Sequence, residues 1–76
     1  MYSIYIDRDD DIWLQHGNKI HAYESVDATL QKNPEFFRSE DRNVEDIISR
    51  WDLRLVTEGT NLQTVAAEAK LELLLR

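Results

Sequence analysis

The chain has 76 residues, of which 42% are hydrophobic and 32% are charged, and it carries a formal net charge of −6. A chain of this length fits one domain, residues 1–76, and buries only about 60–65% of the surface that its unfolded form exposes, which excludes a deep enclosed active site. The negative charge repels phosphate backbones, so no direct binding of DNA or RNA is expected.

Residues 2–23 alternate between the two sides of a backbone in three short runs, which is the pattern of β-strands. We predict strands over about 2–6, 12–16 and 19–24. The acidic turn at 7–11 separates the first two runs, and a second turn contains Gly17 and Asn18, residue types that favour positive φ angles. The three strands are therefore expected to form an antiparallel meander.

The lengths of the two turns set the predicted register. A five-residue loop at 7–11 places Ile4 opposite Leu14. A two-residue second turn would place Leu14 opposite His21 and mix polar with apolar residues on both faces. A three-residue loop with Asn18 in the left-handed region avoids this mixing. With that loop, one face of the meander collects the predicted core: Ile4, Ile6, Ile12, Leu14, Ile20 and Ala22.

The same register gathers aromatic side chains on the opposite face. Two interpretations stay open. Aromatic pairs across strands stabilise a sheet by about 0.2–1 kcal/mol each without any ligand. Alternatively, the amphipathic rings form a contact patch of the kind that is enriched in protein interfaces. On the second interpretation, the partner-binding residues are Tyr5, Trp13, His21 and Tyr23.

After residue 24 the pattern changes to that of helices. Ser25 suits the N-cap of a short helix over about 26–32, and Pro34 prevents its continuation. Phe36 and Phe37 are expected to fill the space between this helix and the sheet.

A second helix is predicted over 44–51, with Asn43 as its N-cap. Its apolar residues recur at helical spacing and form one stripe that faces the sheet. They are Val44, Ile47, Ile48 and Trp51. Residues 53–57 then alternate weakly and suit a short fourth strand at an edge of the meander.

The last helix is predicted over 61–75, because Thr60 and Gln63 have the spacing of a capping box. Its core stripe is Leu62, Val65, Ala66, Ala69 and Leu73. Three further leucines extend the apolar surface around its final turns, and a small monomer cannot easily cover all of them. Either they cap the core, or they form a homodimer interface made of Leu71, Leu74 and Leu75. The predicted fold is thus a two-layer α+β domain, with helices on one face of an antiparallel sheet.

The acidic turn is the first candidate for chemistry. Asp7, Asp9 and Asp11 have the spacing of the first three ligands of a calcium loop. The sixth position of such a loop needs glycine and is Ile12, and the twelfth needs glutamate and is Asn18. We therefore interpret the turn as a solvated acidic surface made of Asp7, Asp9, Asp10 and Asp11.

The histidines and glycines match no catalytic or metal motif. His16 and His21 are predicted on opposite faces, and the sequence holds no further ligands at zinc spacing near them. The only glycines are Gly17 and Gly59, so there is no glycine-rich phosphate loop. No metal, cofactor or enzymatic activity is expected.

The run Tyr5-Ile6-Asp7-Arg8-Asp9-Asp10-Asp11-Ile12-Trp13 resembles the opening hairpin of many small uncharacterised actinobacterial and actinophage proteins. In those proteins the run has the form Tyr-x-Asp-x-Asp-Gly-Asp-x-Trp, so Asp10 stands where the pattern has glycine. The resemblance covers nine residues. It implies a phage or prophage context and no particular activity.

Two functions are weighed on these grounds. The first is a non-catalytic module that binds another protein. The alternative is an acidic nucleic-acid mimic that occupies a basic groove of a DNA- or RNA-handling protein. Its phosphate-like residues would be Asp7, Asp9, Asp10, Asp11, Glu40, Asp41, Glu45 and Asp46. The chain has no cysteine and no stretch typical of a signal peptide or membrane span, so a cytoplasmic location without membrane contact is expected.

Overall fold

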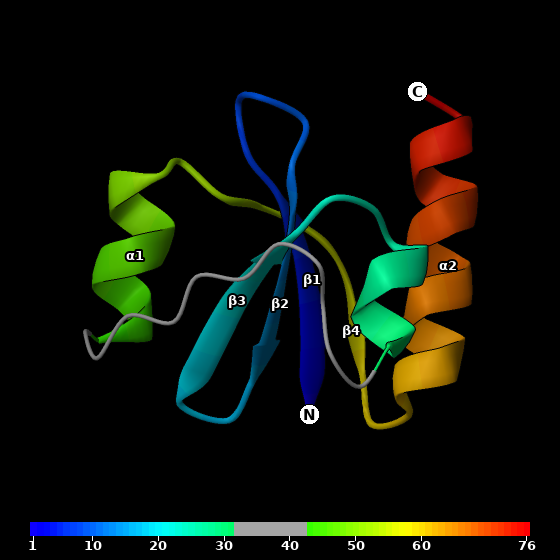
Figure 1. Cartoon of the computed structure of the whole chain (residues 1–76), viewed down its shortest axis with the longest axis horizontal. Helices are drawn as coiled ribbons and strands as arrows, with labels where there is room; N and C mark the ends of the chain where they lie inside the picture. Colours follow the sequence, from blue (N-terminus) through cyan, green and yellow to red (C-terminus); the bar gives the residue numbers. More distant parts are fainter. Residues whose placement is uncertain (32–42) are drawn as a thin grey trace.

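A computed structural model describes residues 1–31 and 43–76 of the chain, and its ribbon is drawn in Figure 1. The described elements are β1 (Tyr2–Ile6), β2 (Ile12–His16), β3 (Lys19–Tyr23), the short 3₁₀ helix η1 (Asp27–Leu30), α1 (Val44–Arg50), β4 (Arg54–Gly59) and α2 (Leu62–Leu74). The strands form one antiparallel sheet in the order β3-β2-β1-β4. This is the predicted α+β class, and the predicted fourth strand pairs with β1 at an edge of the sheet.

The first hairpin has the predicted register. Ile4 pairs with Leu14 and Ile6 with Ile12, so these four side chains share one face. The turn between the strands is closed by a bond from the Asp7 amide to the Asp11 carbonyl (3.0 Å), and Asp10 has a positive φ of 65°. The first turn thus has a left-handed residue that was not predicted.

The second hairpin differs from the prediction. Its turn has two residues, and the positive φ falls on Gly17 (63°), as in a turn with glycine at its first central position. Leu14 therefore pairs with His21, and Trp13 pairs with Ala22. This moves Ile20 and Ala22 to the face opposite the one predicted.

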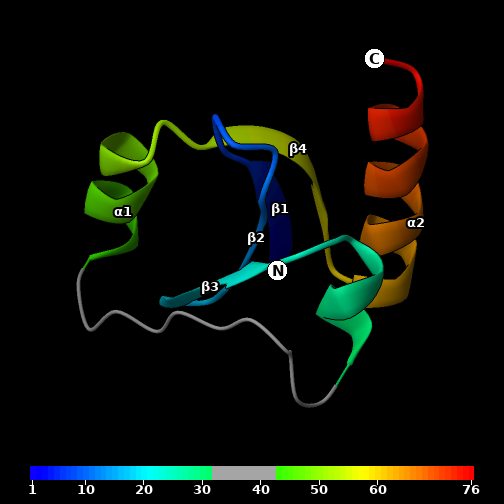
Figure 2. The ribbon, with the colours of Figure 1, turned by 45° about the horizontal axis from the view of Figure 1, so that its top comes forward.

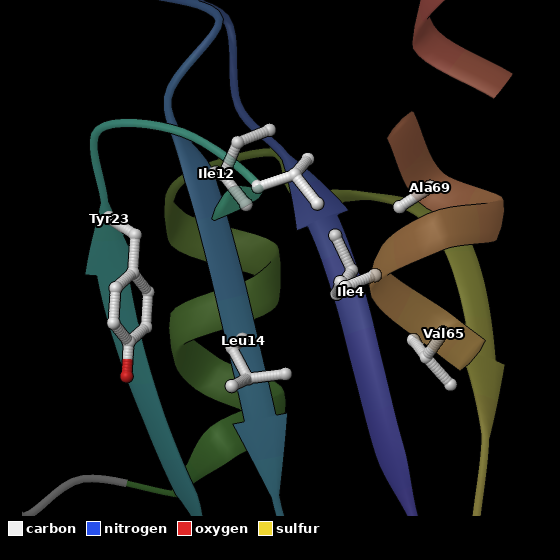
Figure 3. Close-up of a cluster of buried hydrophobic side chains, with 8 residues drawn as sticks. Ile4, Ile12, Leu14, Tyr23, Val65 and Ala69 are labelled. Carbon is white, nitrogen blue, oxygen red and sulfur yellow. The ribbon is translucent and has the colours of Figure 1, made fainter. Parts of the chain in front are cut away.

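The reason is that both faces of the sheet are covered. Ile4, Ile12, Leu14 and Tyr23 form one buried cluster with Val26 and with Val65, Ala66 and Ala69 of α2, and Figure 3 shows Ile4 beside Val65 and Ala69. On the other face, Trp13, Ile20 and Ala22 pack against Val44 and Ile47 of α1 and against Leu53. Figures 1 and 2 show α1 and α2 on opposite sides of the sheet. The prediction that helices cover only one face is wrong, because an apolar stripe twenty residues further along the chain supplies a second core.

The helix ends follow local hydrogen bonds. Asn43 accepts from the Glu45 amide as the predicted N-cap of α1 (2.9 Å). The N-cap of α2 is Asn61, which accepts from the Thr64 amide (3.1 Å), so the predicted capping box at Thr60 is displaced by one residue. The first predicted helix is reduced to η1, with the Ser25 hydroxyl accepting from the Ala28 amide (3.2 Å). The predictions for Phe36 and Phe37 lie outside the described residues.

Candidate interaction surfaces

The carboxylate of Asp7 organises the acidic turn. Its Oδ1 accepts hydrogen bonds from the amides of Asp9 (2.8 Å) and Asp11 (3.0 Å). Its Oδ2 accepts from the indole Nε1 of Trp13 (2.9 Å). Both oxygens of Asp7 are thus engaged within the fold, and Asp7 links the turn to the core under α1. Asp9, Asp10 and Asp11 are exposed.

The four aromatic residues predicted to bind a partner do not form one patch. Trp13 is only 2% exposed and packs against Trp51, with 5.8 Å between the ring centroids. Tyr5 lies beside Trp13 on the same face, while His21 and Tyr23 lie on the α2 face because of the two-residue turn. Tyr23 is buried as well. The structure therefore places these residues largely in the two cores.

Burial also changes the chemistry of two of these phenols. Tyr5 donates from its hydroxyl to Oε1 of Gln15 (3.0 Å). Burial, and secondly the charge of Glu58, raises the pKa of Tyr5 above its ordinary value. Burial alone raises the pKa of Tyr23. Both groups therefore stay neutral at physiological pH and act as packing residues.

Arginines from distant parts of the sequence gather around the acidic turn. Arg8 donates to Oδ2 of Asp52 (3.4 Å), and the Arg54 guanidinium lies 4.0 Å from the same oxygen. Two shallow hollows of about 350 and 390 Å³ open here, and their lining includes Arg8, Arg50, Arg54 and Arg76 beside the aspartates. The predicted acidic surface is thus a surface of mixed charge. Sequence reasoning missed these arginines because Arg50, Arg54 and Arg76 lie far from the turn in the sequence.

The described residues that line the two hollows are arginines and aspartates together with Ile6 and Trp51. In the part of the chain that the structure describes, no three His, Asp or Glu side chains are grouped closely enough to hold a metal ion.

The clearest exposed apolar surface lies on α2. Val65, Ala66 and Ala69 face the sheet and are buried. Leu71 is 61% exposed, and Leu74 and Leu75 are each 76% exposed. Of the two predictions made for these leucines, a role in capping the core is therefore wrong, because Leu73 alone among the four final leucines packs against it.

A shallow hollow of about 230 Å³ adjoins these leucines between α2 and η1. It is lined by Val26, Leu73 and Leu74, with Ser25 at its side. Lys70 and Asp27 form an ion pair across the same boundary, with 2.9 Å between Nζ and Oδ2. The apolar surface therefore continues from the end of α2 toward η1.

Comparison with protein-family models, with curated proteins and with solved structures finds no match to this chain. The resemblance of residues 5–13 to small actinobacterial and actinophage proteins stays a prediction. Within residues 1–31 and 43–76, none of the helices combines the length and the hydropathy that crossing a bilayer requires.

Proposed function

We propose that this chain is a non-catalytic protein-interaction module that binds through the outer face of α2. The observation that carries the proposal is the exposure of Leu71, Leu74 and Leu75 on the side of the helix that faces away from the core. Fully burying one leucine stabilises a complex by about 1.5–3 kcal/mol. Exposed apolar patches of this kind on small domains typically mark sites of protein association.

The nucleic-acid mimic has less support. A mimic needs carboxylates displayed together without nearby cations, so that they match a basic groove. Here Arg8 and Arg54 pair with Asp52 beside the acidic turn, and Asp7 is occupied by hydrogen bonds within the turn. Glu40 and Asp41 lie outside the described residues. The aromatic residues of the sheet also carry no proposal, since Trp13 and Tyr23 are buried.

A binding experiment separates the two functions. Tagged chain is immobilised and mixed either with untagged chain or with a lysate of the source cells, at low and at high salt. On our proposal, a protein is retained at both salt concentrations and is lost with Leu74→Glu. The matched control is Leu55→Glu, which makes the same chemical change at a 47% exposed leucine on β4.

The mimic makes the opposite forecast for the same experiment. Its binding falls steeply as salt is added, and it is lost when Asp9→Asn and Asp10→Asn are combined while Leu74→Glu has no effect. That result would overturn the proposed function.

A further inference from the structure

We infer that the occupant of this α2 surface is α2 of a second copy of the chain, packed in parallel about a two-fold axis. The inference rests on the proposed function and names the partner of the same surface. Figures 1 and 2 show α2 at one margin of the molecule, with its last turns extending past η1. The outer face of the helix is thus accessible along its length.

The outward residues of α2 have the spacing of a helix–helix seam. Thr64, Ala67, Leu71 and Leu74 follow one another at intervals of three and four residues, and all four are exposed. This is the a/d repeat by which two helices pack side by side. We call these four residues and Leu75 the outer stripe. None of its residues is charged, although 32% of the chain is.

The charges beside the outer stripe decide the orientation. At 3.6 residues per turn, Glu68 and Glu72 lie on one flank of the stripe and Lys70 lies on the other. A two-fold axis along the helices brings opposite flanks together, whereas an axis across the helices brings like flanks together. The antiparallel arrangement would therefore place Glu68 against Glu72 of the second copy. The parallel arrangement avoids this contact between like charges, and Lys70 on the opposite flank keeps its ion pair with Asp27.

The size of the stripe sets the strength of the dimer. A helix of 13 residues is about 20 Å long. One such helix face buries less than the roughly 800 Å² per partner of a standard stable interface. Two copies also carry a net charge of −6 each, which opposes association. A reversible, concentration-dependent dimer is therefore expected instead of a permanent one.

The first test is solution mass across a concentration series from micromolar to millimolar. We expect the average mass to rise from 9.0 kDa toward twice that value for the wild type and for Leu55→Glu. Leu74→Glu should remain at the monomer mass throughout. Circular dichroism and thermal melting establish that Leu74→Glu is folded, which its 76% exposure leads us to expect.

The second test fixes the orientation, and it uses the absence of cysteine from the chain. In a parallel pair Thr64 of one copy faces Thr64 of the other. Their Cα atoms then lie within the separation of about 4.4–6.8 Å that a disulfide spans. In an antiparallel pair centred near Lys70, the two Thr64 residues are about 18 Å apart. Mild oxidation should therefore cross-link Thr64→Cys at least ten times faster than Asp46→Cys, an exposed control on α1.

Each outcome bears on one claim. Rapid cross-linking of Thr64→Cys, abolished by Leu74→Glu, supports the parallel second copy. Cross-linking only in a mixture of Thr64→Cys and Leu74→Cys chains shows an antiparallel pair and overturns the inference. A wild type that stays monomeric at millimolar concentration overturns it too. In that case, the proposed function still stands if the chain captures a different protein and loses it with Leu74→Glu. If no protein is captured, both the proposed function and the inference are overturned.

Discussion

The carboxylate of Asp7 accepts hydrogen bonds from three donors, which are the Trp13 indole and the amides of Asp9 and Asp11. Replacing it with alanine leaves the Trp13 indole and two turn amides without their acceptor. Losing the partner of a buried donor typically costs about 1–3 kcal/mol. We expect Asp7→Ala to lower the free energy of unfolding by about 2–3 kcal/mol, measured by chemical denaturation.

Asparagine at the same position provides the control. Its amide oxygen still accepts from the Asp9 and Asp11 amides, but its amide nitrogen cannot accept from the Trp13 indole. Asp7→Asn should therefore fall between wild type and Asp7→Ala. Equal stabilities of the three proteins would show that the Asp7 contacts contribute nothing.

Asp10 holds a left-handed backbone conformation that glycine adopts more readily. Its φ is 65°, a region that costs an ordinary residue roughly 1–2 kcal/mol. Aspartate tolerates this region better than most residues, and glycine adds entropy to the unfolded chain. We therefore expect Asp10→Gly to raise the free energy of unfolding by about 0.5 kcal/mol, which a modest rise in melting temperature would show. Asp9→Gly, in the same turn without a positive φ, should lower it. A loss with Asp10→Gly as large as with Asp9→Gly would contradict this account.

At the scale of elements, β4 and α2 meet at a corner that leaves little room for a side chain at Gly59. A Cβ atom built on Gly59 would lie 3.0 Å from Cγ2 of Val65, and Val65 is only 1% exposed. Because Val65 is buried, the methyl group of Gly59→Ala requires a small shift of the Val65 side chain within the core. We expect a loss of about 1–3 kcal/mol in unfolding free energy.

A double-mutant cycle tests whether this contact is the cause. Combined with Val65→Ala, the Gly59→Ala change should cost less than it does alone, because the methyl group that it meets is gone. Strictly additive losses would place the strain elsewhere.

Elements differed in how far the sequence determined them. The register of the first hairpin was predictable, because a five-residue loop at 7–11 pairs Ile4 with Leu14 and Ile6 with Ile12 on one face. The second hairpin was mispredicted, because the parity of Ile20 and Ala22 was judged against a single core. Only the packing of Val44 and Ile47 explains why Ile20 and Ala22 lie on the face of the sheet that does not carry Leu14.

The candidate surface was predictable in part for a related reason. Spacing identified Leu71, Leu74 and Leu75 as surplus to the α2 core stripe, and the structure leaves them exposed. The mixture of charges at the acidic turn was not predictable, because Arg54 and Asp52 reach it only through the pairing of β4 with β1. Local patterns do not contain that pairing.

For the whole molecule, the partly buried phenol of Tyr5 and the buried phenol of Tyr23 lower stability at alkaline pH. The pKa values of Tyr5 and Tyr23 are raised by burial, so the folded state holds their protons more tightly than the unfolded chain does. Their stabilising contribution is complete below pH 10.0, the ordinary pKa of tyrosine, and is lost as the pH rises through the folded values. Denaturant titrations from pH 8 to 11 should show falling stability above about pH 10.

Phenylalanine removes the titrating group while keeping the ring. Tyr23→Phe should therefore show a smaller alkaline loss than wild type, whereas Tyr2→Phe, on a tyrosine at the margin of the core, should retain the loss. An unchanged alkaline profile in Tyr23→Phe would count against this origin of the effect.

The strand order also has a consequence for synthesis. β1 lies between β2 and β4, so one of its edges is completed only when Gly59 has been added to the chain. A ribosome adds about 5–20 residues per second, so the meander waits for seconds with an open edge and with Ile4 and Leu14 still uncovered. During that interval the nascent chain is most prone to aggregation, because an unpaired strand edge pairs readily with other chains. Slow synthesis of residues 24–59 should therefore lower the yield of folded protein more than slow synthesis of α2 does.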